Sequence, residues 1–229
     1  MKKVIITVLA MLLACSAVFA ATIDSGNYYY DEPKLDDYVG LNVGTSFVYE
    51  TYETNDSMLV DKALQFYTGF SEFAFFDDAP FGIYLDAGVL FNIKDNYDPE
   101  AVSKSPAYAD VMLGLAYRMK TDSRTSFLLS FGPEFTYFTN EYKYINGTDL
   151  VHVEKTYMTM GLTLGAEATY RLGGDWYISL GGKGSIMFLK WMTKEEITRH
   201  GSSEHTYDDG TEGYFGYRIV PKVALYYKF

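Results

Sequence analysis

Ten charged residues stand singly within alternating segments of this 229-residue chain, among small and apolar neighbours. If those segments enclose one interior, the charges could form a network of ion pairs or line a pathway for ions or small solutes. Five are acids and five are bases. An unpaired charge in a narrow, poorly hydrated interior is costly, so equal numbers predict a network that closes the interior, with a pathway as the alternative. The acids are Glu50, Asp86, Asp110, Glu134 and Glu167, and the bases are Arg118, Arg171, Lys183, Arg218 and Lys222.

A second set of reactive residue types lies near the C-terminal end, in "HGSSEHTYDD". Nucleophile, base and acid of a hydrolytic triad are drawn from these types, but the triad needs a fixed relative geometry. Solvated loops commonly contain the same residues, so we predict no catalytic site and no enzyme. A barrel enzyme that acts on lipid or peptide is the less favoured alternative. The residues concerned are Ser202, Ser203, His205, Asp208 and Asp209, with the other histidines at His152 and His200.

The same polar region, from about Met192 to Tyr214, is rich in acids. Weak binding of divalent cations or a simple solvated surface fits this composition, and we favour the surface because no spacing matches a calcium loop. No metal site and no cofactor is therefore predicted. The acids are Glu195, Glu196, Glu204, Asp208, Asp209 and Glu212, beside Lys194 and Arg199.

Eight alternating segments must position these residues, and period-2 alternation is typical of β-strands. One face of each segment is bulky and nearly uncharged, with aromatic residues near the ends. The other face is mostly Gly, Ser, Thr and Ala, which suits the crowded interior of an eight-stranded barrel better than bulk water. The second segment is the least regular, because "FAFF" at its end places aromatics on both faces. The segments begin near Tyr38, Leu59, Phe81, Asp110, Ser126, Met158, Trp176 and Phe215.

Composition and links point to a membrane barrel. No apolar run after the N-terminal region is long enough for a spanning helix, and the net charge of -11 argues against nucleic-acid binding. Short links ("DDAP", "KTDSR", "GGD") alternate with long polar links after the third, fifth and seventh segments. This asymmetry is typical of outer-membrane barrels. We predict an all-β, eight-stranded antiparallel up-and-down transmembrane β-barrel over residues 38–229.

The N-terminal region is typical of an export signal. Lys2 and Lys3 precede an apolar run from Val4 to Phe19, and "VFA" predicts cleavage after Ala20. Residues 1–20 are then a signal peptide and residues 21–37 a periplasmic segment. Cys15 in "LLAC" leaves open a lipoprotein signal, in which this cysteine would be lipidated instead of removed.

With its signal peptide, eight segments, alternating links and terminal "YKF", the chain resembles the small outer-membrane barrels of the OmpX, OmpA-barrel and OmpW group. The resemblance implies an integral outer-membrane monomer in contact with membrane lipid. It also implies that the barrel assembly machinery recognises the last strand, with Leu225, Tyr227 and Phe229 as the signal.

Three functions fit these expectations. A structural or surface-interaction barrel, with a largely plugged lumen and long loops that could meet an extracellular or host ligand, is favoured over a narrow solute channel and over an enzyme. An OmpW-like conduit is the form of channel considered, because four apolar residues also point inward. These are Leu90, Met112, Leu128 and Val220.

Overall fold

The computed structural model describes residues 35–53, 58–76, 79–95, 107–120, 124–146, 149–199, 202–206 and 214–229. The expected signal peptide and nearly all of the expected periplasmic segment lie outside these ranges, as do His200, Asp208 and Asp209. Within the described ranges, no helix has the length and apolar character that a membrane-crossing helix requires.

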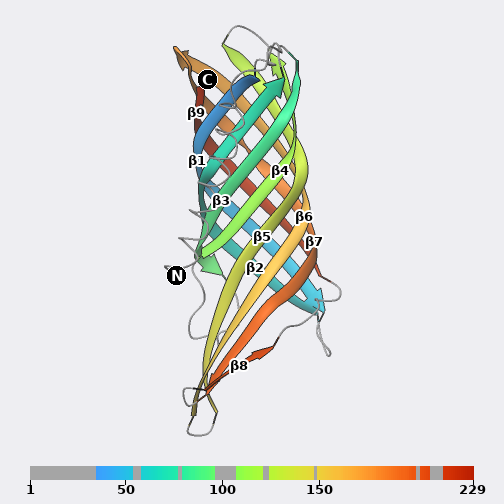
Figure 1. Cartoon of the computed structure of the whole chain (residues 1–229), viewed down its shortest axis with the longest axis vertical. Helices are drawn as coiled ribbons and strands as arrows, with labels where there is room; N and C mark the ends of the chain where they lie inside the picture. The colour runs from blue at the N-terminus through green and yellow to red at the C-terminus, as the bar shows by residue number, and fades with distance from the viewer. Residues whose placement is uncertain are drawn as a thin grey trace, which may run out of the picture. The chain divides into compact units, whose positions relative to one another are not determined.

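The described chain is made of antiparallel strands that pair with their sequence neighbours (Figure 1). Eight of them close a barrel, since β1 pairs with both β2 and β9, and β7 pairs with both β6 and β9. The expected eight-stranded up-and-down barrel is confirmed. The strands are β1 (Leu35–Glu53), β2 (Met58–Phe76), β3 (Phe81–Asp95), β4 (Ala107–Lys120), β5 (Thr125–Asn146), β6 (Asp149–Gly173), β7 (Trp176–Arg199), β8 (Ser202–Thr206) and β9 (Phe215–Lys228).

The alternation of the sequence becomes an inside and an outside. Large apolar side chains cover the outer face, where Leu41 is 74% exposed and Leu115 and Leu180 are each 69% exposed. The alternate positions are buried in the lumen, and β9 alternates exposed and buried residues along most of its length. An apolar exterior of this extent is unfavourable in water and matches a lipid environment.

The first and last strands close the barrel at its seam. Leu41 lies opposite Leu225, and the backbone N–H of Phe229 donates to the carbonyl oxygen of Asp37 over 2.9 Å. The Tyr227 ring contacts the rings of both Trp176 and Phe229, with centroids 5.1 and 4.9 Å apart. The last residue of the chain therefore takes part in the seam and in an aromatic cluster at its edge.

The two ends of the barrel differ, although one link departs from expectation. The sequence predicts a long polar link from β5 to β6. In the structure, β5 ends at Asn146 and β6 begins at Asp149, so only residues 147–148 separate two long strands. The polar sequence here is rich in Tyr, Val and Thr, which favour strands, so a long hairpin replaces a loop. Figure 1 shows β5, β6 and β7 continuing together beyond the other strands, with β8 beside β7.

Candidate functional site: the barrel lumen

A buried carboxylate, Asp86 on β3, is the most densely contacted polar group of the lumen. Its Oδ1 accepts from the Tyr67 hydroxyl over 2.6 Å, and its Oδ2 accepts from the Ser71 and Tyr84 hydroxyls over 2.6 and 2.8 Å. The side chain is fully buried. Such a site is stable only if cations also compensate the carboxylate charge.

Lys183 on β7 is the first of these cations. Its Nζ lies 2.6 Å from Asp86 Oδ1, 2.6 Å from Asp110 Oδ2 and 2.9 Å from Glu134 Oε1. All four side chains are buried, so one ammonium group compensates three carboxylates that come from three successive strands.

Lys222 on β9 is the second cation. Its Nζ lies 2.8 Å from Asp86 Oδ2 and 2.9 Å from Glu167 Oε1. It also donates to the Tyr84 and Ser71 hydroxyls over 2.8 and 3.0 Å. Lys222 therefore connects Asp86 on β3 with Glu167 on β6, across the lumen.

Arg218 completes the group that we call the central network. Its Nη1 donates to Thr136 over 3.0 Å and lies 3.8 Å from both Asp110 Oδ2 and Glu134 Oε1. With Asn42 on β1 and Ser71 on β2 as hydrogen-bonding neighbours of Asp86, the contacts reach all eight barrel strands. The central network consists of Asp86, Asp110, Glu134, Glu167, Lys183, Arg218 and Lys222.

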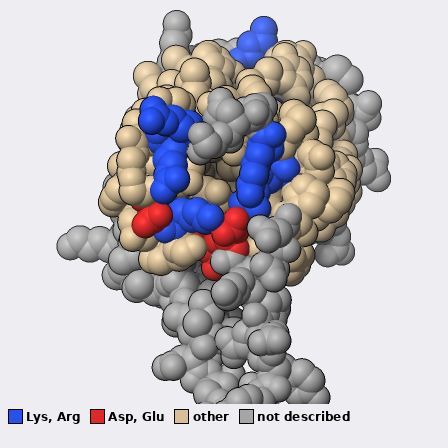
Figure 2. All heavy atoms as spheres, turned by 90° about the horizontal axis from the view of Figure 1, so that it is seen from above, with Lys and Arg blue, Asp and Glu red and all other residues tan. Residues whose placement is uncertain are grey.

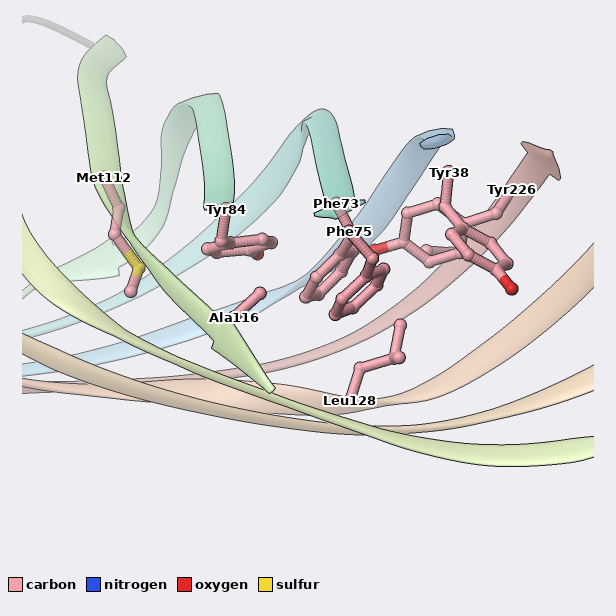
Figure 3. Close-up of a cluster of buried hydrophobic side chains, with 9 residues drawn as sticks. Tyr38, Phe73, Phe75, Tyr84, Met112, Ala116, Leu128 and Tyr226 are labelled. Carbon is pink, nitrogen blue, oxygen red and sulfur yellow. The ribbon is translucent and has the colours of Figure 1, made fainter. Parts of the chain in front are cut away.

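An aromatic cluster fills the lumen on the side of the short turns (Figure 3). Phe73 and Phe75, from the irregular end of β2, both point inward and are at most 1% exposed. Phe73 contacts Tyr84 and Tyr226, with ring centroids 4.4 and 5.9 Å apart. The cluster contains Tyr38, Phe73, Phe75, Tyr84, Met112, Ala116, Leu128, Ala224 and Tyr226.

A second apolar cluster lies on the opposite side of the central network. It contains Tyr67, Leu90, Tyr108, Phe138 and Val220, with Tyr157 packed against it. The four apolar residues that the sequence placed in the interior are thus all buried, two in each cluster.

Lys190 belongs to the lumen, although the alternation of β7 would place it outside. Its Nζ lies 3.4 Å from Glu50 Oε2 and 5.1–5.4 Å from the ring centroids of Phe138, Tyr157 and Tyr214. A register shift explains its direction. Met160 and Gly161 of β6 pair with Leu189 and Met187, so Phe188 is an extra residue that reverses the alternation.

The structure brings together seven of the ten charged residues predicted for the interior, in the central network. Glu50 lies apart with Lys190. Arg118 pairs instead with Asp36, with Nη1 and Oδ2 2.8 Å apart. Arg171 is exposed and donates to the carbonyl oxygen of Gly174 in the turn between β6 and β7. Arg171 therefore lies at the rim, whereas Arg118 is buried in the lumen near that end, because alternation assigns a face but not a depth.

The residue types of the triad hypothesis are not brought into a described site. His152 lies in β6, whereas Ser202, Ser203 and His205 lie in β8, where only the backbone is described. Among the described residues, no group of three or more His, Cys, Asp or Glu side chains could hold a metal ion.

A glycine makes room for the Tyr67 ring that supports Asp86. A Cβ added at Gly88 would lie 2.3 Å from Cε2 of Tyr67, whereas one added at Gly184 would meet nothing within 4 Å. We expect Gly88→Ala to destabilise the barrel by about 1–3 kcal/mol, because the ring must move away from the carboxylate. Gly184→Ala is the matched control and should unfold as the wild type does in a urea titration. Equal stability of the two variants would contradict this role of Gly88.

No protein-family model matches this sequence, and no curated protein matches it. Among solved structures, a major outer membrane protein from Thermus thermophilus is similar with a TM-score of 0.54 at 13% identity, and the match covers 85% of this chain and 99% of that one. Neisserial surface protein A matches with a TM-score of 0.48 at 11% identity, over 82% and 95% of the two chains. The N-terminal β-barrel domain of Pseudomonas aeruginosa OprF matches with a TM-score of 0.44 at 11% identity, over 86% and 100%.

At sequence identities this low, the similarity shows a shared fold and nothing more. The fold comparison is made with the Thermus structure. The strand order, the closure of β1 on β9 and the apolar outer face agree with that fold. The closed barrel and its apolar exterior are those of an integral outer-membrane protein, and the chain has the fold of the small eight-stranded outer-membrane β-barrels.

Proposed function

We propose that this protein is an outer-membrane barrel with a lumen closed to solutes, and that it acts at the cell surface through its long strands and loops. The observation that carries the proposal is the central network, which contacts every barrel strand and lies between two apolar clusters. A structural or surface-interaction role follows more directly from this arrangement than transport does.

The physical argument concerns water. A conducting pathway requires mobile water along the lumen, whereas the described charges of the central network contact one another or hydroxyl groups at short range. Tyr67, Tyr84, Tyr226, Leu90 and Met112 are at most 1% exposed. An eight-stranded barrel is just wide enough for its side chains to fill the interior, which supports closure.

The part of the sheet that extends beyond the barrel, made of β5, β6, β7 and β8, offers the surface for an interaction. About 9–11 residues suffice for a tilted strand to cross a membrane. β6 has 25 residues and β7 has 24, so both continue well past the apolar belt. β8 widens the same sheet by pairing with residues 195–199 of β7.

The lumen is tested by electrical recording. We expect purified protein in planar bilayers to show no steady conductance, because a filled lumen leaves no continuous water column. A large-pore porin reconstituted in the same way is the positive control. Stable currents whose ion selectivity changes in Arg218→Met would reject the closed lumen and favour the narrow channel.

Orientation is tested by labelling intact cells. Single cysteines at Ser202 in β8 and at Asp175 in the β6–β7 turn would be treated with a membrane-impermeant maleimide. We expect labelling at Ser202 alone, because long loops face outward and short turns inward in outer-membrane barrels. Labelling at Asp175 alone would show the opposite orientation, and the extended strands could then have no role at the cell surface.

A further inference from the structure

Basic side chains gather around the barrel mouth at the end that carries the short turns. Figure 2, which views the barrel from above, shows Lys and Arg side chains on opposite sides of a recess, with Asp and Glu side chains beside them. The lumen-facing positions of β4, β6 and β9 end there in Lys120, Arg171 and Lys228, and Arg124 immediately precedes β5. Described acids lie at the same end, with Asp36 and Asp37 at the start of β1 and Asp175 in the β6–β7 turn.

The group contains two sets of neighbouring residues. Arg118 Nη1 and Lys228 Nζ both lie 2.8 Å from the Asp36 carboxylate, at its two oxygens. The backbone N–H of Arg171 donates to the carbonyl oxygen of Arg124 over 2.8 Å, so those two residues are neighbours. Asp36 is thus an acid that joins Arg118 of β4 to Lys228 of β9.

Arg118 is built into the base of this group rather than lying on its surface. Its guanidinium carbon lies 4.4 Å from the Phe75 ring centroid, and the residue is only 3% exposed. Stacking fixes the guanidinium plane, and its Nη1 group donates to Asp36. Its Nη2 group is buried and has no hydrogen-bond partner in the described structure, which is costly unless an acceptor is supplied.

We infer that this mouth is a binding site for a phosphate-bearing anion. Arginine donates two parallel hydrogen bonds to a phosphate, and several separated cations suit its multiple charges. The aromatic cluster beneath Arg118 makes the site a dead end, so it is distinct from transport. The phosphate belongs either to a soluble compound or to a phospholipid headgroup of the adjacent leaflet, which share this chemistry.

The test uses the full mature chain in phosphatidylcholine nanodiscs, with pyrophosphate as the soluble probe in calorimetry at low salt. The variant is Lys120→Ala with Arg171→Ala, both at exposed positions, and the control is Lys62→Ala, which removes an exposed cation from β2. We expect at least about tenfold weaker binding for the double variant, as for lost charge-assisted hydrogen bonds, and no change for the control. Arg171→Lys should also weaken binding, because it keeps the charge but loses the paired donors.

A second arm distinguishes the two sources of phosphate. Nanodiscs that contain phosphatidylglycerol would be compared by counting the lipids retained by the protein in native mass spectrometry. Selective retention that the double variant loses assigns the site to a headgroup, and pyrophosphate binding in phosphatidylcholine assigns it to a soluble anion. Absence of both, or equal binding by the double variant and the wild type, would overturn the inference.

Discussion

Replacing Lys183 by Met is expected to lower the free energy of unfolding by roughly 3–5 kcal/mol, the cost of breaking a buried ion pair by removing one partner. The Lys183 ammonium contacts Asp86, Asp110 and Glu134 within 2.9 Å, and all of them are buried. Without it, Asp86 keeps Lys222 at 2.8 Å, but Asp110 and Glu134 keep only Arg218, whose Nη1 lies 3.8 Å from each. Urea titration of the refolded barrel in detergent, followed by heat-modifiable gel mobility, measures the loss.

The control and a compensating variant separate charge from side-chain volume. Lys120→Met changes the same residue type at the exposed rim, where we expect a loss of no more than about 1 kcal/mol. Adding Asp110→Asn and Glu134→Gln to Lys183→Met removes two of the three carboxylate charges and should restore much of the stability. A Lys183→Met barrel that unfolds at the same urea concentration as the wild type would show that the central network does not stabilise the fold.

Deletion of Phe229 is expected to remove most of the folded barrel from the outer membrane of cells, while signal cleavage continues. The expectation rests on the resemblance of "YKF" to the terminal strand that the assembly machinery recognises in small outer-membrane barrels. The structure adds that Phe229 is 73% exposed and that its ring contacts Tyr227, so its own packing is limited. Folding in detergent should therefore depend on Phe229 much less than assembly in cells does.

Two assays on matched variants make this distinction. Heat-modifiable mobility would be measured in cell membranes and after refolding in detergent, for the Phe229 deletion and for Lys228→Ala. Lys228 pairs with Asp36 at the rim, so its substitution tests the same end of β9 without removing the terminal ring. A loss in cells alone indicates recognition of the terminal residue, and a loss in both assays indicates closure of the seam through the Phe229–Asp37 hydrogen bond. Normal folding in both assays would refute the role of the last strand that we assign.

The charged residues show how far sequence reasoning reaches. Alternation assigned Asp86, Lys183 and Lys222 to the interior, since a strand sends successive side chains to opposite faces. It assigned Arg118 and Arg171 to the same interior, where Arg118 is buried apart from the central network, whereas Arg171 is exposed at the rim. The height of a residue along the barrel axis depends on the tilt of the strands and on the stagger between neighbouring strands. Both are set by how the strands pair, which alternation within one strand does not reveal.

Departures from alternation were decided by the tertiary structure. The aromatics of "FAFF" do not depart from it: Phe73 and Phe75 lie on the lumen face of β2 with Ser71, where Phe73 packs against Tyr84 and Tyr226. Lys190 faces the lumen because one extra residue at Phe188 reverses the order of faces. In the sequence, this bulge could have been recognised from the adjacent residues Phe188 and Leu189, because two neighbouring large apolar residues that both face outward indicate an extra residue in the strand.

By itself, the sequence determined the all-β class, the eight barrel strands and the two faces of each strand, because local alternation is a property of single segments. The tertiary structure alone decided which acid meets which base, where the β5–β6 hairpin extends, and that basic residues converge at one mouth. The ion pairs join residues that are far apart in the sequence: Lys183 and Asp86 are 97 positions apart, and Lys222 and Asp86 are 136 positions apart. Closing the barrel brings such residues within contact distance, and no local pattern encodes the stagger at which it closes.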